Sequence, residues 1–286
     1  MSARTAFLWS IRREVAEYRS VYIAPLVIAA FALAGFVYAV AKHGIKPLYA
    51  LDPAMQAQAM AIPYSMAASV ILLTGWLVGI MYASDALHGE RRDRSILFWK
   101  SLPVSDLVTV ASKAAIPLLA IPAICIAVAI VTQLVMLVLG SAMLAAAGGD
   151  PALPWKVWPM GRQTIVMLYG MAIHILWFAP IYAWLLLVSA WAKRAVLLWA
   201  FVPLLGLFAI EKVSLNTSWL MSAIQYRILG AMTEGFARDA LRRPITEFSQ
   251  LDPVRFFSNP NLWLGLAFAG LCFALAVRLR RYGEPI

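Results

Sequence analysis

Long apolar runs separated by short polar segments dominate the pattern of this chain. A helix needs about 20 apolar residues to cross a bilayer, and six runs approach or exceed that length, although the last two are short for a span. They cover residues 21–41, 62–83, 114–139, 165–190, 195–210 and 262–277. The pattern predicts an all-α polytopic membrane protein with six transmembrane helices, organised as a single transmembrane domain over residues 1–286.

A shorter amphipathic segment precedes the first apolar run. Residues 4–19 place one set of apolar side chains on a single helical face and the charged residues off it. The apolar set is Phe7, Leu8, Ile11, Val15 and Tyr18, and the charged set is Arg12, Arg13, Glu14 and Glu17. This arrangement is typical of a helix lying in the membrane interface, which we expect over residues 1–20; a solvated basic tail is the alternative.

Composition and charge support this class and indicate a topology. The chain is 63% hydrophobic and 13% charged, with a net charge of +10, whereas soluble domains are about 25% charged. With the N-terminus placed inside, Lys and Arg concentrate in the inner segments (before residue 21, within 84–113, at 193–194 and at 278–281), while the first two outer loops hold only Lys42, Lys46, Lys156 and Arg162. By the positive-inside rule both termini are cytoplasmic. We therefore expect a multi-pass protein of the plasma membrane, the inner membrane in bacteria, and no nucleic-acid partner.

Several kinds of chemistry are missing from the sequence. The chain has no G-x-x-x-x-G-K-[ST] phosphate loop, and His43, His88 and His174 are too scattered to predict a metal site. Cys125 and Cys272 lack metal-ligand spacing. The predicted spans hold carboxylates only near their ends, which argues against a carrier driven by protons or sodium. We predict no catalytic residue, no metal and no cofactor on this chain.

Two polar residues lie inside predicted spans. Gln133 falls in the third and His174 in the fourth. Such residues can line a substrate path, although polar side chains in membrane bundles more often hydrogen-bond between packed helices. Both interpretations remain open.

The most polar interruption is the segment 84–113, which we interpret as a cytoplasmic loop. The second span can continue to Arg94, because Glu90 and Arg94 stand at i and i+4. Ser95 can then cap a short helix over residues 96–101 that exposes Ile96, Phe98, Trp99 and Lys100, and Pro103 ends it. Ser105 is the expected N-cap of the next span, with Asp106 in its first turn.

This loop resembles the first cytoplasmic loop of type-2 ABC exporter permeases, the transmembrane subunits of ABC transporters. The resemblance rests on E-R-R-D-R-S-I-L-F-W-K-S-L-P-V-S-D, followed by Lys113 at the start of a span. It implies a coupling helix over 96–101 that docks in a separate ATPase subunit, with Glu90 and Arg91 at its base. The residues implicated in coupling are Glu90, Arg91, Arg94, Ile96, Phe98, Trp99, Lys100, Leu102 and Pro103. One departure is that many members have Gly-Thr where this chain has Arg94-Ser95.

A long polar segment, 211–261, precedes the last span. Leu220, Ile224, Ile228 and Ala231 share one helical face, and Pro244 ends a second piece that contains Arg238, Arg242 and Arg243. In the family that this chain resembles, the region forms short helices that partly re-enter the membrane. An outer cap is the alternative expectation here.

These observations lead to one expected function and two alternatives. The resemblance implies the permease subunit of an ABC exporter, which moves a lipid, drug, antibiotic or amphipathic peptide and is not itself an enzyme. Its partners would be ABC ATPase subunits that bind ATP and Mg²⁺, a second permease copy (identical or homologous), and membrane lipids. The alternatives are a stand-alone channel or carrier and an intramembrane enzyme resembling a protease.

Overall fold

The computed structural model describes residues 3–43, 52–97, 104–237, 244–245 and 247–282. Within these ranges the regular structure is helical, apart from one isolated antiparallel bridge between Phe236 and Leu251. Six of the described helical segments are long and apolar enough to cross a membrane. These helices therefore support the predicted class, a helical multi-pass membrane protein; they do not identify the membrane.

The helices follow one another in this order. The N-terminal half contains α1 (Ala3–Glu17), α2 (Ser20–His43), α3 (Pro53–Asp85), α4 (His88–Arg92), α6 (Asp106–Ala115), the π-helical segment η2 (Ile116–Ala120) and α7 (Ile121–Ala146). The C-terminal half contains α8 (Leu153–Val157), α9 (Met160–Trp191), α10 (Val196–Leu215), α11 (Trp219–Gly235), the 3₁₀ turn η3 (Phe248–Gln250), α12 (Pro253–Ser258) and α13 (Pro260–Tyr282).

Apart from residue 195, which precedes α10, each predicted span lies within a helical segment, and the helices are longer than the apolar runs. The second candidate span covers Pro53–Arg92 and the third Asp106–Ala146. The extra turns belong to the ends, where polar residues continue the helix beyond its apolar core. The fifth run, predicted to end at residue 210, continues to Leu215 and so includes Glu211.

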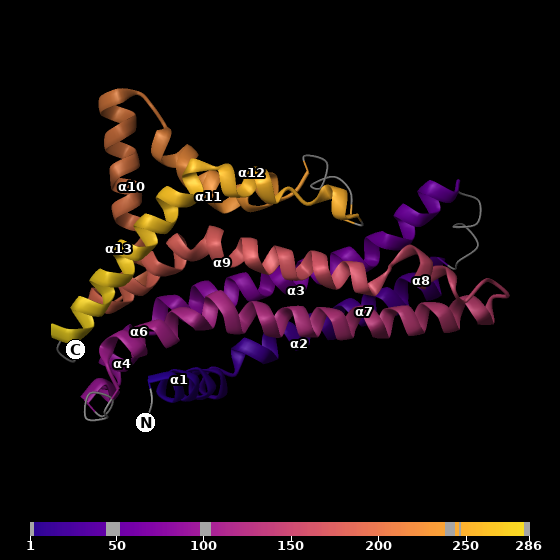
Figure 1. The fold of residues 1–286 in the computed structure, drawn as a ribbon, viewed down its shortest axis with the longest axis horizontal. Coiled ribbons are helices and arrows are strands. Elements are labelled where there is room, and N and C mark those ends of the chain that lie inside the picture. The colour runs from indigo at the N-terminus through magenta and orange to yellow at the C-terminus, as the bar shows by residue number, and fades with distance from the viewer. Residues whose placement is uncertain (1–2, 44–51, 98–103, 238–243, 246, 283–286) are drawn as a thin grey trace.

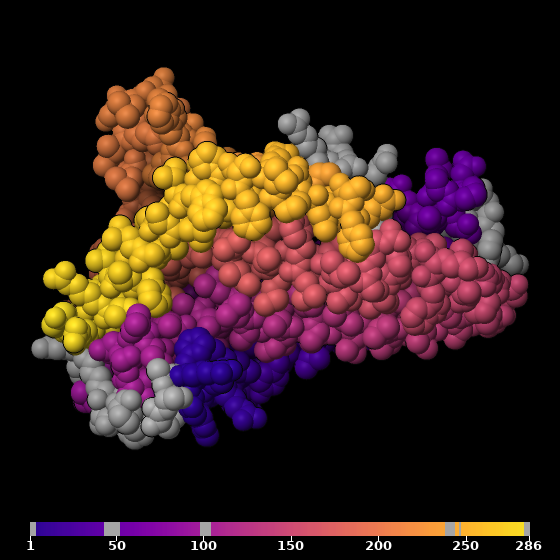
Figure 2. Space-filling model, viewed as in Figure 1, coloured from indigo at the N-terminus to yellow at the C-terminus, as the bar shows by residue number. Residues whose placement is uncertain are grey.

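Four long helices form the body of the molecule. α2, α3, α7 and α9 run side by side along its longest axis (Figure 1) and contact one another in the pairs α2 with α3, α2 with α7, and α3 and α7 with α9. α13 packs along α9, and α11 and α12 lie on the same side (Figure 1). α10 projects from this body near one end, as the space-filling view makes plain (Figure 2).

Small residues permit the tightest of these contacts. Gly75 and Gly79 stand one turn apart on α3, in a small-xxx-small arrangement that lets helices approach closely. A Cβ on Gly75 would overlap the Cys125 sulfur of α7, and one on Gly79 would lie 2.9 Å from the Tyr182 hydroxyl of α9. Close packing on both sides of α3 therefore depends on these two positions.

The third span changes its helical winding near its first third. Between α6 and α7, residues Ile116–Ala120 adopt π-helical geometry around Pro117. Proline has no N–H to donate and disturbs the α-helical ladder, and π-bulges are a usual way for a helix to absorb such a defect. The Pro117 carbonyl instead accepts a hydrogen bond from His174 Nε2 of α9, at 3.3 Å.

The segment after α10 folds back along the body. The Glu211 carboxylate accepts hydrogen bonds from Thr217 Oγ1 (2.7 Å) and Leu220 N (3.0 Å), so it caps the start of α11. Trp177, near the middle of α9, donates from Nε1 to the Arg227 carbonyl of α11 at 2.8 Å. α11 thus lies beside the middle of a candidate span and not beyond its end (Figure 1). Arg238, Arg242 and Arg243 are outside the described residues.

Candidate functional site

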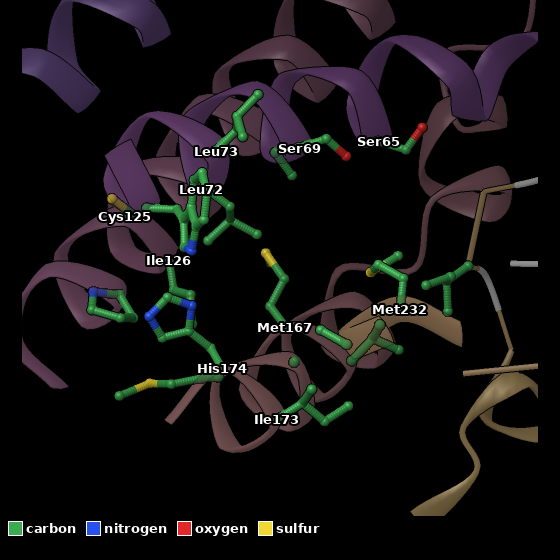
Figure 3. Close-up of a pocket in the computed structure, with 18 of the residues that line it drawn as sticks. Ser65, Ser69, Leu72, Leu73, Cys125, Ile126, Met167, Ile173, His174 and Met232 are labelled. Carbon is green, nitrogen blue, oxygen red and sulfur yellow. The ribbon is translucent and has the colours of Figure 1, made fainter. Parts of the chain in front are cut away.

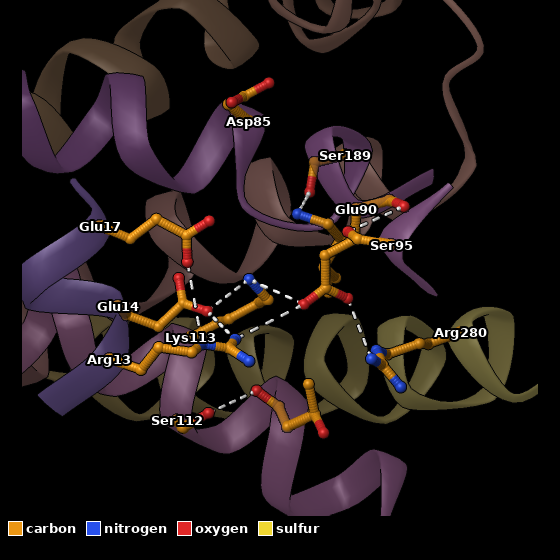
Figure 4. A network of polar contacts seen from close by, with 12 residues as sticks. Arg13, Glu14, Glu17, Asp85, Glu90, Ser95, Ser112, Lys113, Ser189 and Arg280 are labelled. Carbon is orange, nitrogen blue, oxygen red and sulfur yellow. Dashed lines mark hydrogen bonds and ion pairs between the residues drawn. The ribbon is translucent and has the colours of Figure 1, made fainter. Parts of the chain in front are cut away.

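Charged side chains from four helices converge at the end of the body where both termini lie (Figures 1 and 4). α1 contributes Arg13 and Glu14, α4 contributes Glu90, α6 contributes Asp106 and Lys113, and α13 contributes Arg280. We call these six residues the charge cluster. Its members span almost the whole sequence, so it joins segments that are remote along the chain.

Lys113 and Arg280 hold the centre of the cluster together. Lys113 Nζ lies 2.9 Å from Glu14 Oε1 and 3.2 Å from Glu90 Oε1. Arg280 Nη2 donates to Glu90 Oε2 at 2.9 Å, and its other terminal nitrogen pairs with Asp106. The Tyr82 hydroxyl donates to Glu14 Oε2 at 2.6 Å. Each buried carboxylate of the cluster is therefore paired with at least one cation (Figure 4).

The centre of the cluster is buried, Arg13 and Asp106 at its edge are partly exposed, and the charges balance, three acidic against three basic. Glu14 and Lys113 are 1% and 2% exposed. Burial alone would raise the pKa of Glu14, but the charge of Lys113 and hydrogen bonds from Tyr82, Lys113 and Arg13 outweigh it and lower that pKa. Removing one partner of a buried ion pair typically costs about 3–5 kcal/mol, because the other charge is left uncompensated. The cluster therefore fastens α1, α4, α6 and α13 to one another.

Residues 87–91, which include most of α4, also form hydrogen bonds with the C-terminal end of α9. Arg91 Nη1 donates to the Ala190 carbonyl at 2.7 Å, which satisfies a free carbonyl at the C-terminal end of that helix. Leu87 N donates to Ser189 Oγ at 3.3 Å, and His88 Nε2 lies 3.3 Å from the Lys193 carbonyl. Residues 87–91 are thus bound on several sides, and little freedom remains for them to move alone.

The residues predicted to contact a partner are divided between the interior and the surface. Glu90 is buried in the charge cluster and Arg91 is half-buried against α9, so neither side chain projects outward. Ile96 was expected to be exposed, but it is 2% exposed; that expectation is wrong, because the chain turns at Arg94 and directs Ile96 inward. Arg94 is exposed. Phe98, Trp99, Lys100, Leu102 and Pro103 are outside the described residues.

Local details of the loop differ from the predicted ones. α4 ends at Arg92 and Arg94 lies outside it, so the expected pairing of Glu90 with Arg94 does not form. Residues 95–97 are helical, which makes Ser95 the first helical residue and not its cap; its hydroxyl donates to the Glu90 carbonyl at 3.4 Å. Ser105 is confirmed as the cap of α6, since its side chain accepts a hydrogen bond from Val108 N.

Sequence reasoning did not find the role of Glu14. It was assigned to the charged face of the N-terminal helix, but it belongs to the packed face. Ile11, Val15 and Tyr18 pack against the main hydrophobic core, and position 14 falls among them at i+3 from 11 and i−4 from 18. The available signal was that Glu14 shares a helical face with apolar residues, together with a basic residue, Lys113, at the start of the third predicted span.

A large cavity forms a second candidate site, apart from the charge cluster. It has a volume of about 740 Å³ and is lined by α3, α7, α9 and α11 and by residues that follow α11. Ser65, Ser69, Leu72 and Leu73 form the α3 wall, Cys125 and Ile126 belong to α7, Met167, Ile173 and His174 to α9, and Met232 to α11 (Figure 3). The volume is within the usual range for sites that enclose a small molecule.

Both residues predicted for a substrate path line this cavity. Gln133 and His174 come from different helices, and the structure brings them to the same space. Each also bonds between helices: Gln133 Nε2 donates to the Tyr64 carbonyl at 3.1 Å, and His174 Nε2 contacts the Pro117 carbonyl. The sequence left two alternatives open, lining a substrate path and hydrogen-bonding between helices. For Gln133 and His174 the two are therefore compatible.

No protein-family model, curated protein or solved structure matches this chain. Within the described residues, no group of three or more His, Cys, Asp or Glu side chains is placed to hold a metal ion. The described side chains offer ion pairing in the charge cluster and mostly apolar walls in the cavity.

Proposed function

We propose that this chain is the membrane-spanning subunit of an ATP-driven exporter of the ABC class. A separate ATPase subunit would bind at the surface formed by residues 92–94 and Leu97, all of which are exposed. The observation that carries the proposal is the charge cluster. It fastens a surface loop to α1, α6 and α13, which is the property a coupling element needs in order to move several helices together.

A continuous path of contacts supports transmission from the loop to the cavity. Lys113, paired with Glu90 of the loop, lies on α6, and α6 continues through η2 into α7. The Pro117 carbonyl of η2 bonds to His174, which lines the cavity. A displacement of α4 by a partner would therefore act on α6 at its root and on the cavity walls further along. π-Helical segments are rare, and those inside α-helices are frequently found at functional sites.

The backbone at Arg94 adds a second line of support. Its φ is +57°, in the left-handed region that favours glycine. Glycine is the residue that the type-2 exporters resembled by this loop often have at that position. Position 94 thus has a backbone conformation suited to glycine although arginine occupies it, and the exchange of Gly-Thr for Arg94-Ser95 adds a positive charge to the surface proposed to meet the ATPase.

The proposal is tested with charge reversals at the two ends of the molecule. The chain is co-expressed with a candidate ABC ATPase subunit from the same organism, purified by a tag, and assayed for bound ATPase and for ATP hydrolysis. We expect Arg94→Glu to reduce the co-purified ATPase roughly tenfold, because a reversed charge at an interface opposes association. Lys156→Glu, an exposed reversal at the opposite end (68% of the Lys156 side chain is exposed), should leave it unchanged.

A second surface variant makes the outcome independent of charge. Leu97 is 57% exposed, and the uncharged substitution Leu97→Asn should also weaken ATPase binding without affecting insertion or yield. Normal ATPase binding and hydrolysis in both variants would show that this surface is not the docking site. Transport by the purified chain in vesicles without any ATPase would instead favour a stand-alone channel or carrier.

A further inference from the structure

The walls of the cavity are suited to an uncharged molecule. Among its described lining residues there is no Asp, Glu, Lys or Arg, and most are aliphatic, aromatic or methionine. Met167 and Met171 of α9 and Met232 of α11 supply unbranched side chains that adapt to irregular shapes. A formal charge within such walls would lose its hydration without a compensating partner, so charged ligands are disfavoured.

One part of the lining carries polar groups without partners. Gln133 Oε1, Trp158 Nε1 and Gln163 Nε2 are buried atoms that make no hydrogen bond within the described chain. Their side chains are almost fully buried, with residue exposures of 1%, 2% and 3%. A buried polar atom left unpaired normally costs free energy, and native proteins hold few of them without a reason.

These groups are neighbours. Gln133 bonds to the Tyr64 backbone, the Trp158 ring stacks on the Tyr64 ring with centroids 5.5 Å apart, and Gln163 lies in the first turn of α9 just after Trp158. Two of the three unpaired atoms are N–H donors. Trp76 Nε1, further along the cavity, is a third unpaired donor. Donors thus outnumber acceptors, which matches a ligand that carries acceptor oxygens.

The cavity opens on the flank of the helical body. Met66 and Leu73 of α3 are 60% and 56% exposed, and Leu229 of α11 is 68% exposed, yet all three line the cavity. Its rim between α3 and α11 is therefore mostly apolar, with Ser69 as an exposed polar member. In a bundle that crosses a membrane this flank faces hydrocarbon, so a ligand dissolved in the bilayer can reach the cavity without passing through water.

We propose that this cavity binds an uncharged, mostly apolar molecule bearing carbonyl or ether oxygens, which enters from the bilayer between α3 and α11. Gln163 and Trp158 donate hydrogen bonds to those oxygens. Identifying the ligand as the exported substrate rests on the proposed function, but its binding does not, because the site belongs to this chain alone.

Steroids provide a matched set of probes for the test. Progesterone is an uncharged tetracycle with two ketone oxygens, 5α-pregnane has the same skeleton without oxygen, and pregnenolone sulfate adds an anionic group. Binding of tritiated progesterone to the purified, detergent-solubilised chain is measured by scintillation proximity, with the other two as competitors. We expect saturable binding, and competition by pregnane and by the sulfate at least tenfold weaker than by unlabelled progesterone.

Gln163→Leu separates a binding role from a structural one. Leucine removes the unpaired amide at nearly constant volume, so the thermal midpoint of the ligand-free protein should rise while progesterone affinity falls about tenfold. Gln225→Leu is the matched control: Gln225 lies on α11, is exposed and does not line the cavity, and both quantities should stay unchanged. Trp158→Phe, which removes only the indole donor, should also lower affinity.

Three results would overturn the inference. They are the absence of saturable progesterone binding, pregnane competing as well as progesterone, and a Gln163→Leu protein that loses thermal stability or keeps full affinity. The assay contains no ATPase, so each of these results would leave the coupling proposal standing. Conversely, if the ATPase does not bind at the proposed surface, the progesterone binding measured here would be unchanged.

Discussion

At the scale of single residues, the charge cluster shows how a carboxylate becomes structural. Glu14 is ionised in the interior because Lys113, Arg13 and the Tyr82 hydroxyl surround it. Its neighbour Glu17 makes only a 3.8 Å contact with Arg13 and its side chain is 64% exposed. Two acidic residues on one short helix thus differ in burial, in partners and in the free energy that they contribute.

Glu14→Gln should destabilise the protein by about 3 kcal/mol at pH 7, because Lys113 loses its closest partner. The pKa of Glu14 is lowered from the usual 4.5 in the folded state. Its stabilising contribution is therefore complete above pH 4.5 and is lost as the pH falls through the lowered value. Thermal midpoints measured from pH 7 to pH 3 should fall less steeply in Glu14→Gln than in the parent protein.

Glu17→Gln provides the control for this experiment, since it removes an exposed carboxylate from the same helix. It should shift the midpoint little and keep the parent pH dependence, as exposed ion pairs contribute about 0–1 kcal/mol. An identical pH slope in the parent and in Glu14→Gln would mean that Glu14 does not control the acid sensitivity.

At the scale of helices, α11 is positioned by side-chain fit. Its start is capped by Glu211 of α10, and its far half is pressed against α9 at Gly230 and Gly235. Arg227 lies over the Trp177 ring, 4.6 Å from its centroid, in a cation–π contact. These contacts hold α11 as a wall of the cavity, so disturbing them should change both stability and cavity shape.

Gly230→Ala tests this packing against helix propensity. A Cβ at position 230 would lie 2.6 Å from the Trp177 ring, so we expect a destabilisation of about 1–3 kcal/mol from overpacking. Gly270→Ala on α13 adds the same methyl where nothing lies within 4 Å. That variant should gain up to about 1 kcal/mol from propensity. Thermal or denaturant midpoints compare the two, and equal shifts would contradict the close α11–α9 contact.

At the scale of the whole molecule, α1, the loop after α3 and the end of α13 share one end of the body (Figure 1), and the charge cluster joins them. The turn that holds Asp150 lies at the opposite end, after α7. Both native cysteines are buried, at 1% and 2% exposure, so they do not interfere with surface labelling. Topology can therefore be measured with single introduced cysteines.

Asp93→Cys and Asp150→Cys should label from opposite sides of the membrane. Their parent side chains are 62% and 51% exposed. Because basic residues concentrate on the side of the 84–113 loop, we expect an impermeant maleimide to reach position 150 in intact cells and position 93 only in inverted vesicles. Arg4→Cys should follow position 93. Labelling of 93 and 150 from the same side would contradict the six-span arrangement.

The limits of prediction are clearest in the loop and the first helix. The cap at Ser105 was predictable because it depends on local hydrogen bonding. The inward turn of Ile96 was not, because it follows from the left-handed backbone at Arg94, a conformation that arginine itself does not favour. Glu14 was misplaced because its partner, Lys113, is ninety-nine positions away along the chain. Helical periodicity gives no information about contacts between residues so far apart in sequence.

The sequence by itself determined the long apolar helices and the number of candidate spans. Whether an apolar run is long enough to cross a bilayer depends only on consecutive residues. The sequence also indicated which loop is polar and which polar residues lie at membrane depth. Only the tertiary structure decided that Gln133 and His174 line one cavity and that Glu14, Glu90, Lys113 and Arg280 form one cluster. Those facts depend on packing between distant segments, and each is set by the shapes and charges of several helices at once.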